Sequence, residues 1–167
     1  MEISALIIVI ALVLVAIGAY VIFGAKSGKS KKLDYAFKER DGALTVQGTS
    51  RTPTVLCDRS KGVIEIRGRS MPENSHEFYR PIEIWIDAYV KEPHPVTQLF
   101  IELQYFNTSS SQCLVAIFKK MEHLHESSEG VTINWVYEDD DMLMAGQDYE
   151  SIISVPFKFI EVVETGG

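Results

Sequence analysis

The sequence lacks several features that large functional classes require. Its two cysteines are too few for a disulfide framework or a four-cysteine zinc site. The net charge of -7 excludes a strongly basic nucleic-acid binder. No stretch matches GxxxxGK[ST] or GxGxxG, so the sequence has no glycine-rich phosphate loop. What is present is a globular composition, 46% hydrophobic and 23% charged, which excludes a wholly disordered chain.

A run without charged residues extends from Ile3 to Ala25 near the N-terminus. As a helix it would be about 34 Å long, enough to cross a hydrocarbon core of about 30 Å. A buried core helix and a cleaved signal peptide are the alternatives, but a signal peptide carries basic residues before its apolar run, and only Met1 and Glu2 precede this one. We therefore predict a retained transmembrane anchor over residues 1–25.

Positive charge directly after the span predicts its orientation. The lysines concerned are Lys26, Lys29, Lys31 and Lys32. Because basic residues stay on the cytoplasmic side, we expect a single-pass protein of the cytoplasmic membrane, with its N-terminus outside and the rest of the chain in the cytoplasm. In that reducing compartment Cys57 and Cys113 are expected to be free, buried thiols.

The remaining chain divides by charge. Residues 26–51 carry seven basic and three acidic side chains, whereas residues 52–167 have a net charge of about −10. We interpret the first part as a basic tether near anionic headgroups. It can include a short strand, because residues 41–50 resemble residues 61–70 in the pattern Gly-x-apolar-x-apolar-x-Gly-x-Ser. Residues 52–162 form the predicted soluble domain, and residues 163–167 a flexible C-terminus.

Hydrophobic periodicity predicts alternating strands and helices in this domain. We expect strands at 54–57, 62–67, 97–106, 131–137 and 155–162, helices at 72–91 and 109–127, and a short acidic helix or turn at 139–147. Ser70 and Glu73 are predicted to form a capping box, and Pro81 to kink or restart the first helix. The expected fold is α/β: a mixed sheet of about five strands, with two main helices packed on it.

A row of polar side chains joins the strand at 97–106 to the following helix. Asn107, Thr108 and Ser109 are good N-cap residues, so a plain helix cap is one interpretation. Phosphorylation is the other, because the free amides and positive dipole of a helix N-terminus stabilise a phosphate. The sequence predicts no catalytic residue, since no histidine lies nearby to activate Ser109, Ser110 or Ser111.

Metal ligation is not expected either. His123 and His125 are two residues apart on a helix and do not share a face. The consecutive carboxylates at 138–141 point in different directions, so we interpret them as a solvated helix cap or an acidic partner-facing edge. No metal or other cofactor is predicted.

Four sequence blocks together resemble the SiaC family of regulatory phosphoproteins, over about residues 52–162. They are Gly68-Arg-Ser-Met-Pro-Glu-Asn74, Phe78-Tyr-x-Pro-Ile-x-x-Trp85, Tyr105-Phe-Asn-Thr-Ser-Ser110 and Trp135-x-Tyr-Glu-Asp-Asp140. The resemblance implies a STAS-like fold similar to the anti-sigma-factor antagonists. It also implies a non-enzymatic role in partner switching, with a serine/threonine kinase and a PP2C-type phosphatase as partners.

The resemblance further implies the residues of the switch. The modified residue of the family falls on Thr108, with Ser109 as a fallback acceptor, and Asn107, Ser109 and Ser110 would support the phosphate or the partner. The implied effector is a diguanylate cyclase, which links the switch to cyclic-di-GMP and biofilm formation. The alternative is a membrane-tethered small-molecule-binding or enzymatic domain with a pocket near the same junction.

Overall fold

The computed structural model describes residues 35–127 and 130–162, which lie in the compact unit that begins at Asp34. The predicted anchor at residues 1–25, residues 26–34 of the predicted tether and the predicted flexible end at residues 163–167 lie outside the described residues. Within the described ranges, no helix is both long enough and apolar enough to cross a membrane.

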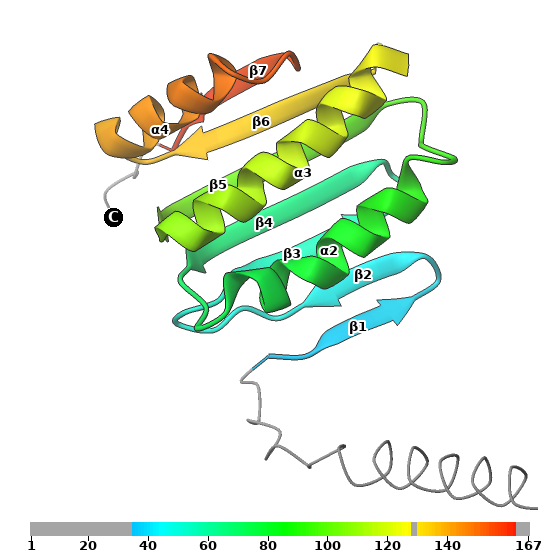
Figure 1. The fold of residues 1–167 in the computed structure, drawn as a ribbon, viewed down its shortest axis with the longest axis horizontal. Coiled ribbons are helices and arrows are strands. Elements are labelled where there is room, and N and C mark those ends of the chain that lie inside the picture. Colours follow the sequence, from blue (N-terminus) through cyan, green and yellow to red (C-terminus); the bar gives the residue numbers. More distant parts are fainter. Residues whose placement is uncertain (1–34, 128–129, 163–167) are drawn as a thin grey trace, which may run out of the picture. The chain divides into compact units, whose positions relative to one another are not determined.

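One sheet organises the described part of the chain (Figure 1). Its seven strands are, in sheet order, β1 (Phe37–Arg40), β2 (Ala43–Val46), β3 (Thr54–Asp58), β4 (Val63–Ser70), β5 (Thr97–Phe106), β6 (Val131–Tyr137) and β7 (Phe157–Glu161). β1 to β4 pair antiparallel, and β4 to β7 pair parallel. The parallel strands are joined by α2 (Ser75–Tyr89), α3 (Thr108–Ser127) and α4 (Asp140–Glu150).

All three helices lie on one face of the sheet. Figure 1 shows α2 and α3 crossing in front of the strands. α4 lies on the same face, because the indole nitrogen of Trp135, a core residue of β6, donates to the Met142 carbonyl at 2.8 Å. A Cβ on Gly146 would lie 2.6 Å from the Trp135 ring, so this glycine permits the close approach of α4 to β6. The opposite face carries no helix of the described residues.

The core lies between this helical layer and the sheet. Alternate strand residues such as Ile64, Ile101 and Trp135 are fully buried against Phe78 of α2 and Phe118 of α3. Burial of such side chains contributes about 1.5–3 kcal/mol each. Cys57 in β3 and Cys113 in α3 are buried and free, at the predicted positions. Burial raises the pKa of the Cys57 thiol.

The predicted count of about five strands was too low, since the sheet has seven, whereas the short helix or turn predicted at 139–147 is the helix α4. The difference comes mainly from β1 and β2, which occupy residues 37–46 of the predicted tether. The similarity between residues 41–50 and 61–70 has a structural counterpart here. Gly42 and Gly62 adopt positive φ angles of 77° and 65° just before β2 and β4. Such turns favour glycine because it has no Cβ.

The predicted capping box of α2 was wrong, and of the kink or restart predicted at Pro81 the structure excludes the restart. The N-cap is Asn74, whose side chain accepts a hydrogen bond from the Glu77 amide at 3.2 Å, whereas Ser70 belongs to β4. The Ser70 hydroxyl instead lies 2.7 Å from the buried Tyr79 hydroxyl. The helix also runs from Ser75 to Tyr89 without a restart at Pro81. Proline removes one amide from the hydrogen-bond ladder, and the buried apolar face of α2 holds the helix together around it.

Candidate functional site

The carboxyl edge of the parallel strands is where the three helices begin. β4, β5 and β6 end at the same edge, and α2, α3 and α4 follow them within a few residues. The first amides of a helix lack intrahelical partners and carry a partial positive charge. The edge therefore gathers three such N-termini, and the predicted site at Asn107–Ser110 lies on the middle one.

Asn107 caps α3. Its Oδ1 accepts a hydrogen bond from the Ser110 amide at 2.8 Å, and its carbonyl accepts from the Ser111 amide at 2.9 Å. Its own amide donates to the carbonyl of Ser70 at the end of β4, which fixes the cap to the sheet. The amides of Thr108 and Ser109 have no hydrogen-bond partner in the described part of the chain, so two donors remain available at this end of α3.

The four consecutive hydroxyl side chains of this helix start differ in their access to solvent. Thr108 and Ser109 are exposed. Ser110 is fully buried, and its hydroxyl lies 3.1 Å from that of Ser75 in the first turn of α2. Ser111 is partly buried and lies 2.7 Å from the Tyr149 hydroxyl of α4. The Ser110 side chain therefore faces inward and holds two helix N-termini together, while the roles predicted for Asn107, Ser109 and Ser110 toward a phosphate or a partner stay predictions.

Two residues of this arrangement were missed at the sequence level. Ser75 also donates to Asn107 Oδ1 at 3.4 Å, so it contacts both the cap and Ser110. Its position directly after Asn74 could have placed it in the first turn of the helix, but the predicted capping box at Ser70 and Glu73 set the helix start too early. Tyr149 lies 38 residues after its partner Ser111 and has no local signal. Burial raises the pKa of the Tyr149 hydroxyl.

An aromatic and basic pair borders the same edge on the open face of the sheet. The Arg69 guanidinium lies 5.4 Å from the ring centroid of Tyr105, and this ring is 45% exposed. The pair follows a register shift between β4 and β5, next to Gly68 with a φ of 103°. Exposed tyrosine and arginine are residue types that often dominate protein interfaces.

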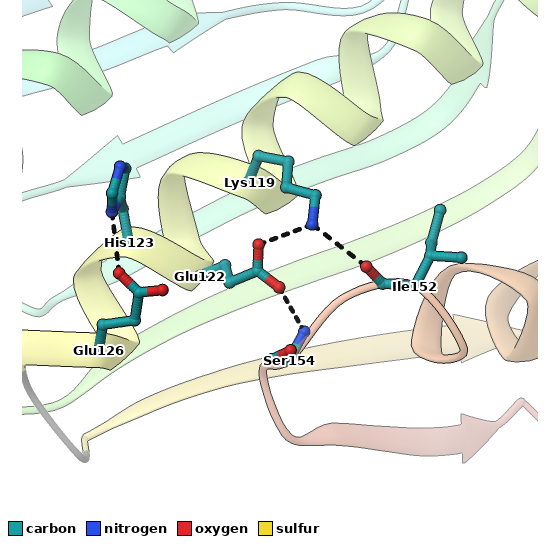
Figure 2. A network of polar contacts seen from close by, with 6 residues as sticks. All are labelled: Lys119, Glu122, His123, Glu126, Ile152 and Ser154. Carbon is teal, nitrogen blue, oxygen red and sulfur yellow. Dashed lines mark hydrogen bonds and ion pairs between the residues drawn. The ribbon is translucent and has the colours of Figure 1, made fainter.

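Farther along α3, the helix is fixed to the segment that follows α4 (Figure 2). The Lys119 ammonium donates to Glu122 at 2.7 Å and to the Ile152 carbonyl at 3.2 Å. Glu122 also accepts from the Ser154 amide at 2.7 Å. The hydrogen bond from Lys119 lowers the pKa of the Glu122 carboxyl. These contacts, together with the Ser111–Tyr149 bond, hold α3 in one position relative to α4.

Acidic residues begin α4 at the same edge of the sheet. Asp139 is the N-cap and accepts from the Met142 amide at 2.8 Å, while Asp140 and Asp141 lie in the first turn. These positions agree with the interpretation of the carboxylates at 138–141 as a helix cap. No group of three histidine, cysteine or carboxylate side chains within the described ranges is arranged to hold a metal ion.

A cavity of about 470 Å³ lies between α2 and the β1–β2 hairpin. Leu44, Arg59, Arg80 and Trp85 are among its lining residues, and none of the lining residues belongs to α3. This cavity therefore does not provide the pocket at the Thr108 junction that the enzymatic or small-molecule alternative requires.

The model of the SiaC family of regulatory phosphoproteins matches residues 46–162, more than half of the chain. The chain belongs to the SiaC family. It is 28% identical over 116 residues to an uncharacterised protein of Pseudomonas aeruginosa (strain UCBPP-PA14), a match that covers 68% of this chain and 92% of that protein. β1 and the turn after it precede the family match, whereas Thr108 and the whole parallel half of the sheet lie inside it.

Solved structures of SiaC from Pseudomonas aeruginosa resemble this fold. Apo-SiaC aligns with a TM-score of 0.67 at 26% identity, covering 71% of this chain and 98% of that chain. SiaC in complex with the diguanylate cyclase SiaD, which it activates, aligns with a TM-score of 0.68 at 26% identity, covering 71% and 99%. Family membership identifies this chain as a regulatory protein, in agreement with the predicted non-enzymatic role.

Proposed function

We propose that this SiaC-family protein is a membrane-tethered switch, controlled by reversible phosphorylation of Thr108. The exposed Thr108 hydroxyl carries this proposal, because it lies in the first turn of a capped 20-residue helix beside two unused amides. Ser110 and Ser111 direct their hydroxyls to Ser75 and Tyr149 instead. Among the neighbouring hydroxyls this leaves Ser109 as the fallback acceptor.

Phosphate on Thr108 would change the surface more than the fold. It adds about −1.5 to −2 charges, and the free amides and dipole of α3 offset part of its desolvation. The unmodified edge binds the effector, and the dianion weakens that contact because burying an unpaired charge costs several kcal/mol. A serine/threonine kinase adds the phosphate and a PP2C-type phosphatase removes it, so the chain itself catalyses no step.

The effector class comes from a structural relative. Pseudomonas aeruginosa SiaC is an activator of the diguanylate cyclase SiaD. By analogy, the effector of this chain is a diguanylate cyclase, and the output is cyclic-di-GMP synthesis and biofilm formation. The proposed anchor at residues 3–25 places the switch at the cytoplasmic membrane with its N-terminus outside. A probe cysteine in the tether tests this, because a membrane-impermeant label added to intact cells should not react with it.

Phosphosite mapping combined with binding measurements tests the switch. After incubation with the cognate kinase, we expect phosphate on Thr108, and effector affinity should fall by more than a hundredfold, equivalent to about 3 kcal/mol. Thr108→Ala should bind the effector regardless of kinase treatment. Ser109→Ala is the matched control, because it removes the neighbouring exposed hydroxyl and should still be switched.

Two outcomes contradict the proposal. One is phosphate found only outside residues 107–111. The other is an unchanged effector affinity after complete modification of Thr108.

A further inference from the structure

The face of the sheet opposite the helices is uncovered by the described residues. In β3 to β7, the residues between the core positions point to this open face, since successive side chains of a strand alternate. Leu56, Val63, Phe100 and Val136 lie there, half-buried and outside the hydrophobic core. Parallel strands are normally covered on both faces, so an open parallel half indicates a partner layer.

A row of four side chains crosses the centre of this open face. The strand register aligns Glu65, Phe100, Asn134 and Lys158 on β4, β5, β6 and β7. Asn134 is only 3% exposed, yet its amide nitrogen has no hydrogen-bond partner among the described residues. Lys158 is exposed and makes no ion pair within the described ranges. The row therefore carries its charges at its two ends, Glu65 and Lys158, and uncharged side chains in its middle.

We propose that this open face binds a second copy of the same chain, sheet against sheet. A two-fold axis parallel to the strands, between β5 and β6, exchanges the two ends of the row. It sets Glu65 against the second copy's Lys158, and Phe100 against the second copy's Asn134. The neighbouring row obeys the same symmetry, because Gln98 and Thr132 are adjacent in register and become polar partners of one another.

Charge complementarity favours a second copy as the occupant. Glu65 and Glu102 share a single cation, Arg67, at 3.2 and 3.1 Å. Around Glu65, away from Arg69 near the end of β4, one negative charge is therefore left over, while Lys158 leaves one positive charge on β7. The axis brings these opposite charges together twice. Packed sheets lie about 10 Å apart, a gap that a lysine and a glutamate can close from opposite sides.

An isologous interface repeats each contact on both sides of its axis, so the Glu65–Lys158 and Gln98–Thr132 pairs would each form twice. The inference goes beyond the proposed switch, because no step in it uses Thr108.

Zero-length cross-linking of the full chain tests this proposal. Within one copy, Glu65 and Lys158 are three strands apart, about 14 Å, so a carbodiimide cannot join them directly. An amide bond between them must therefore link two copies. Mixing unlabelled and nitrogen-15-labelled protein identifies such links by mass spectrometry. Lys120 and Asp87, which form an ion pair within one copy, provide the internal control for the reagent.

Charge variants give a second, independent readout by sedimentation velocity. Lys158→Glu should raise the dimer dissociation constant more than tenfold, because it places two carboxylates together. Adding Glu65→Lys should restore the dimer, since it reverses both charges. Lys91→Glu makes the same charge change on an exposed lysine after α2 and should leave the dimer intact.

The proposal is overturned if the Lys120–Asp87 link forms but no mixed-isotope Glu65–Lys158 link appears. It is also overturned if the dimer is indifferent to Lys158→Glu, or if the wild-type chain stays monomeric. Should Glu65→Lys fail to fold, the wild-type cross-link decides alone. Thr108→Ala should leave the cross-link unchanged, so failure here and failure of the phosphorylation switch are distinguishable.

Discussion

Replacing Asn107 with alanine tests whether one side chain orders the start of α3. Asn107 Oδ1 holds the Ser110 amide at 2.8 Å, and alanine offers no acceptor in its place. The Ser75 hydroxyl also loses its 3.4 Å contact with Oδ1 but keeps its bond to Ser110, so no buried hydroxyl is left without a partner. The expected cost is therefore that of a lost N-cap, about 1 kcal/mol.

Thermal unfolding of the purified protein measures this cost. For a folded unit of this size, a loss of about 1 kcal/mol lowers the melting temperature by roughly 3–5 °C. Asn107→Asp is the matched control, because a carboxylate oxygen caps a helix as well as an amide oxygen does and should leave the melting temperature nearly unchanged. The reasoning is refuted if Asn107→Ala melts with the wild type, or if Asn107→Asp is destabilised as strongly as Asn107→Ala.

Three further predictions concern the packing and the turns. Gly146→Ala should lower the free energy of unfolding by about 1–3 kcal/mol in denaturant titrations, because the added methyl group has no room between α4 and the sheet. Ser70→Ala should cost about 1–3 kcal/mol by leaving the buried Tyr79 hydroxyl unpaired, and adding Tyr79→Phe should recover part of that loss. Asp58, whose pKa is lowered to about 2 by hydrogen bonds from Ser60 and Lys61, should stabilise the fold at neutral pH. The melting temperature of Asp58→Asn should therefore fall below that of the wild type at pH 7, and this difference should disappear as the pH falls from about 4 to 2.

Each of these predictions has a result that contradicts it. An alanine at position 146 that leaves unfolding unchanged would mean that α4 can move away from the sheet at no cost. A double variant of Ser70 and Tyr79 no more stable than the single one would show that the hydroxyl pair is not the cause. A difference between wild type and Asp58→Asn that persists at pH 2 would exclude the carboxylate charge.

The parallel half of the fold was largely predictable from the sequence. The predicted bounds of β5 and β6 agree with the structure, and α3 begins one residue earlier than expected. These elements have long apolar patterns with clear periods, 2 for strands and 3.6 for helices. The N-cap at Asn107 and the exposure of Thr108 follow from the same junction between a strand and a helix.

The antiparallel half was harder to predict. β1 and β2 are four residues each, and β1 carries three charged side chains, Lys38, Glu39 and Arg40. A short charged strand has no distinctive hydrophobic pattern, and its place at the sheet edge depends on pairing with β2. The prediction of where α2 begins was wrong for another reason. Ser70 and Asn74 are both good caps, and only tertiary packing of Ser70 against Tyr79 separates them.

The strand order of the sheet has consequences for how the chain folds and for where strands can be added to it. Every strand pairs with its neighbours along the chain, from β1 through β7. Pairing therefore closes only short loops or single strand–helix–strand units, so no strand pair requires a loop longer than one such unit to close. A sheet built in chain order can also be lengthened at its first strand without rewiring any other connection. β1 and β2, of which only Val46 lies inside the family match, are such an extension, and a variant that begins after them should still be able to assemble β3 to β7.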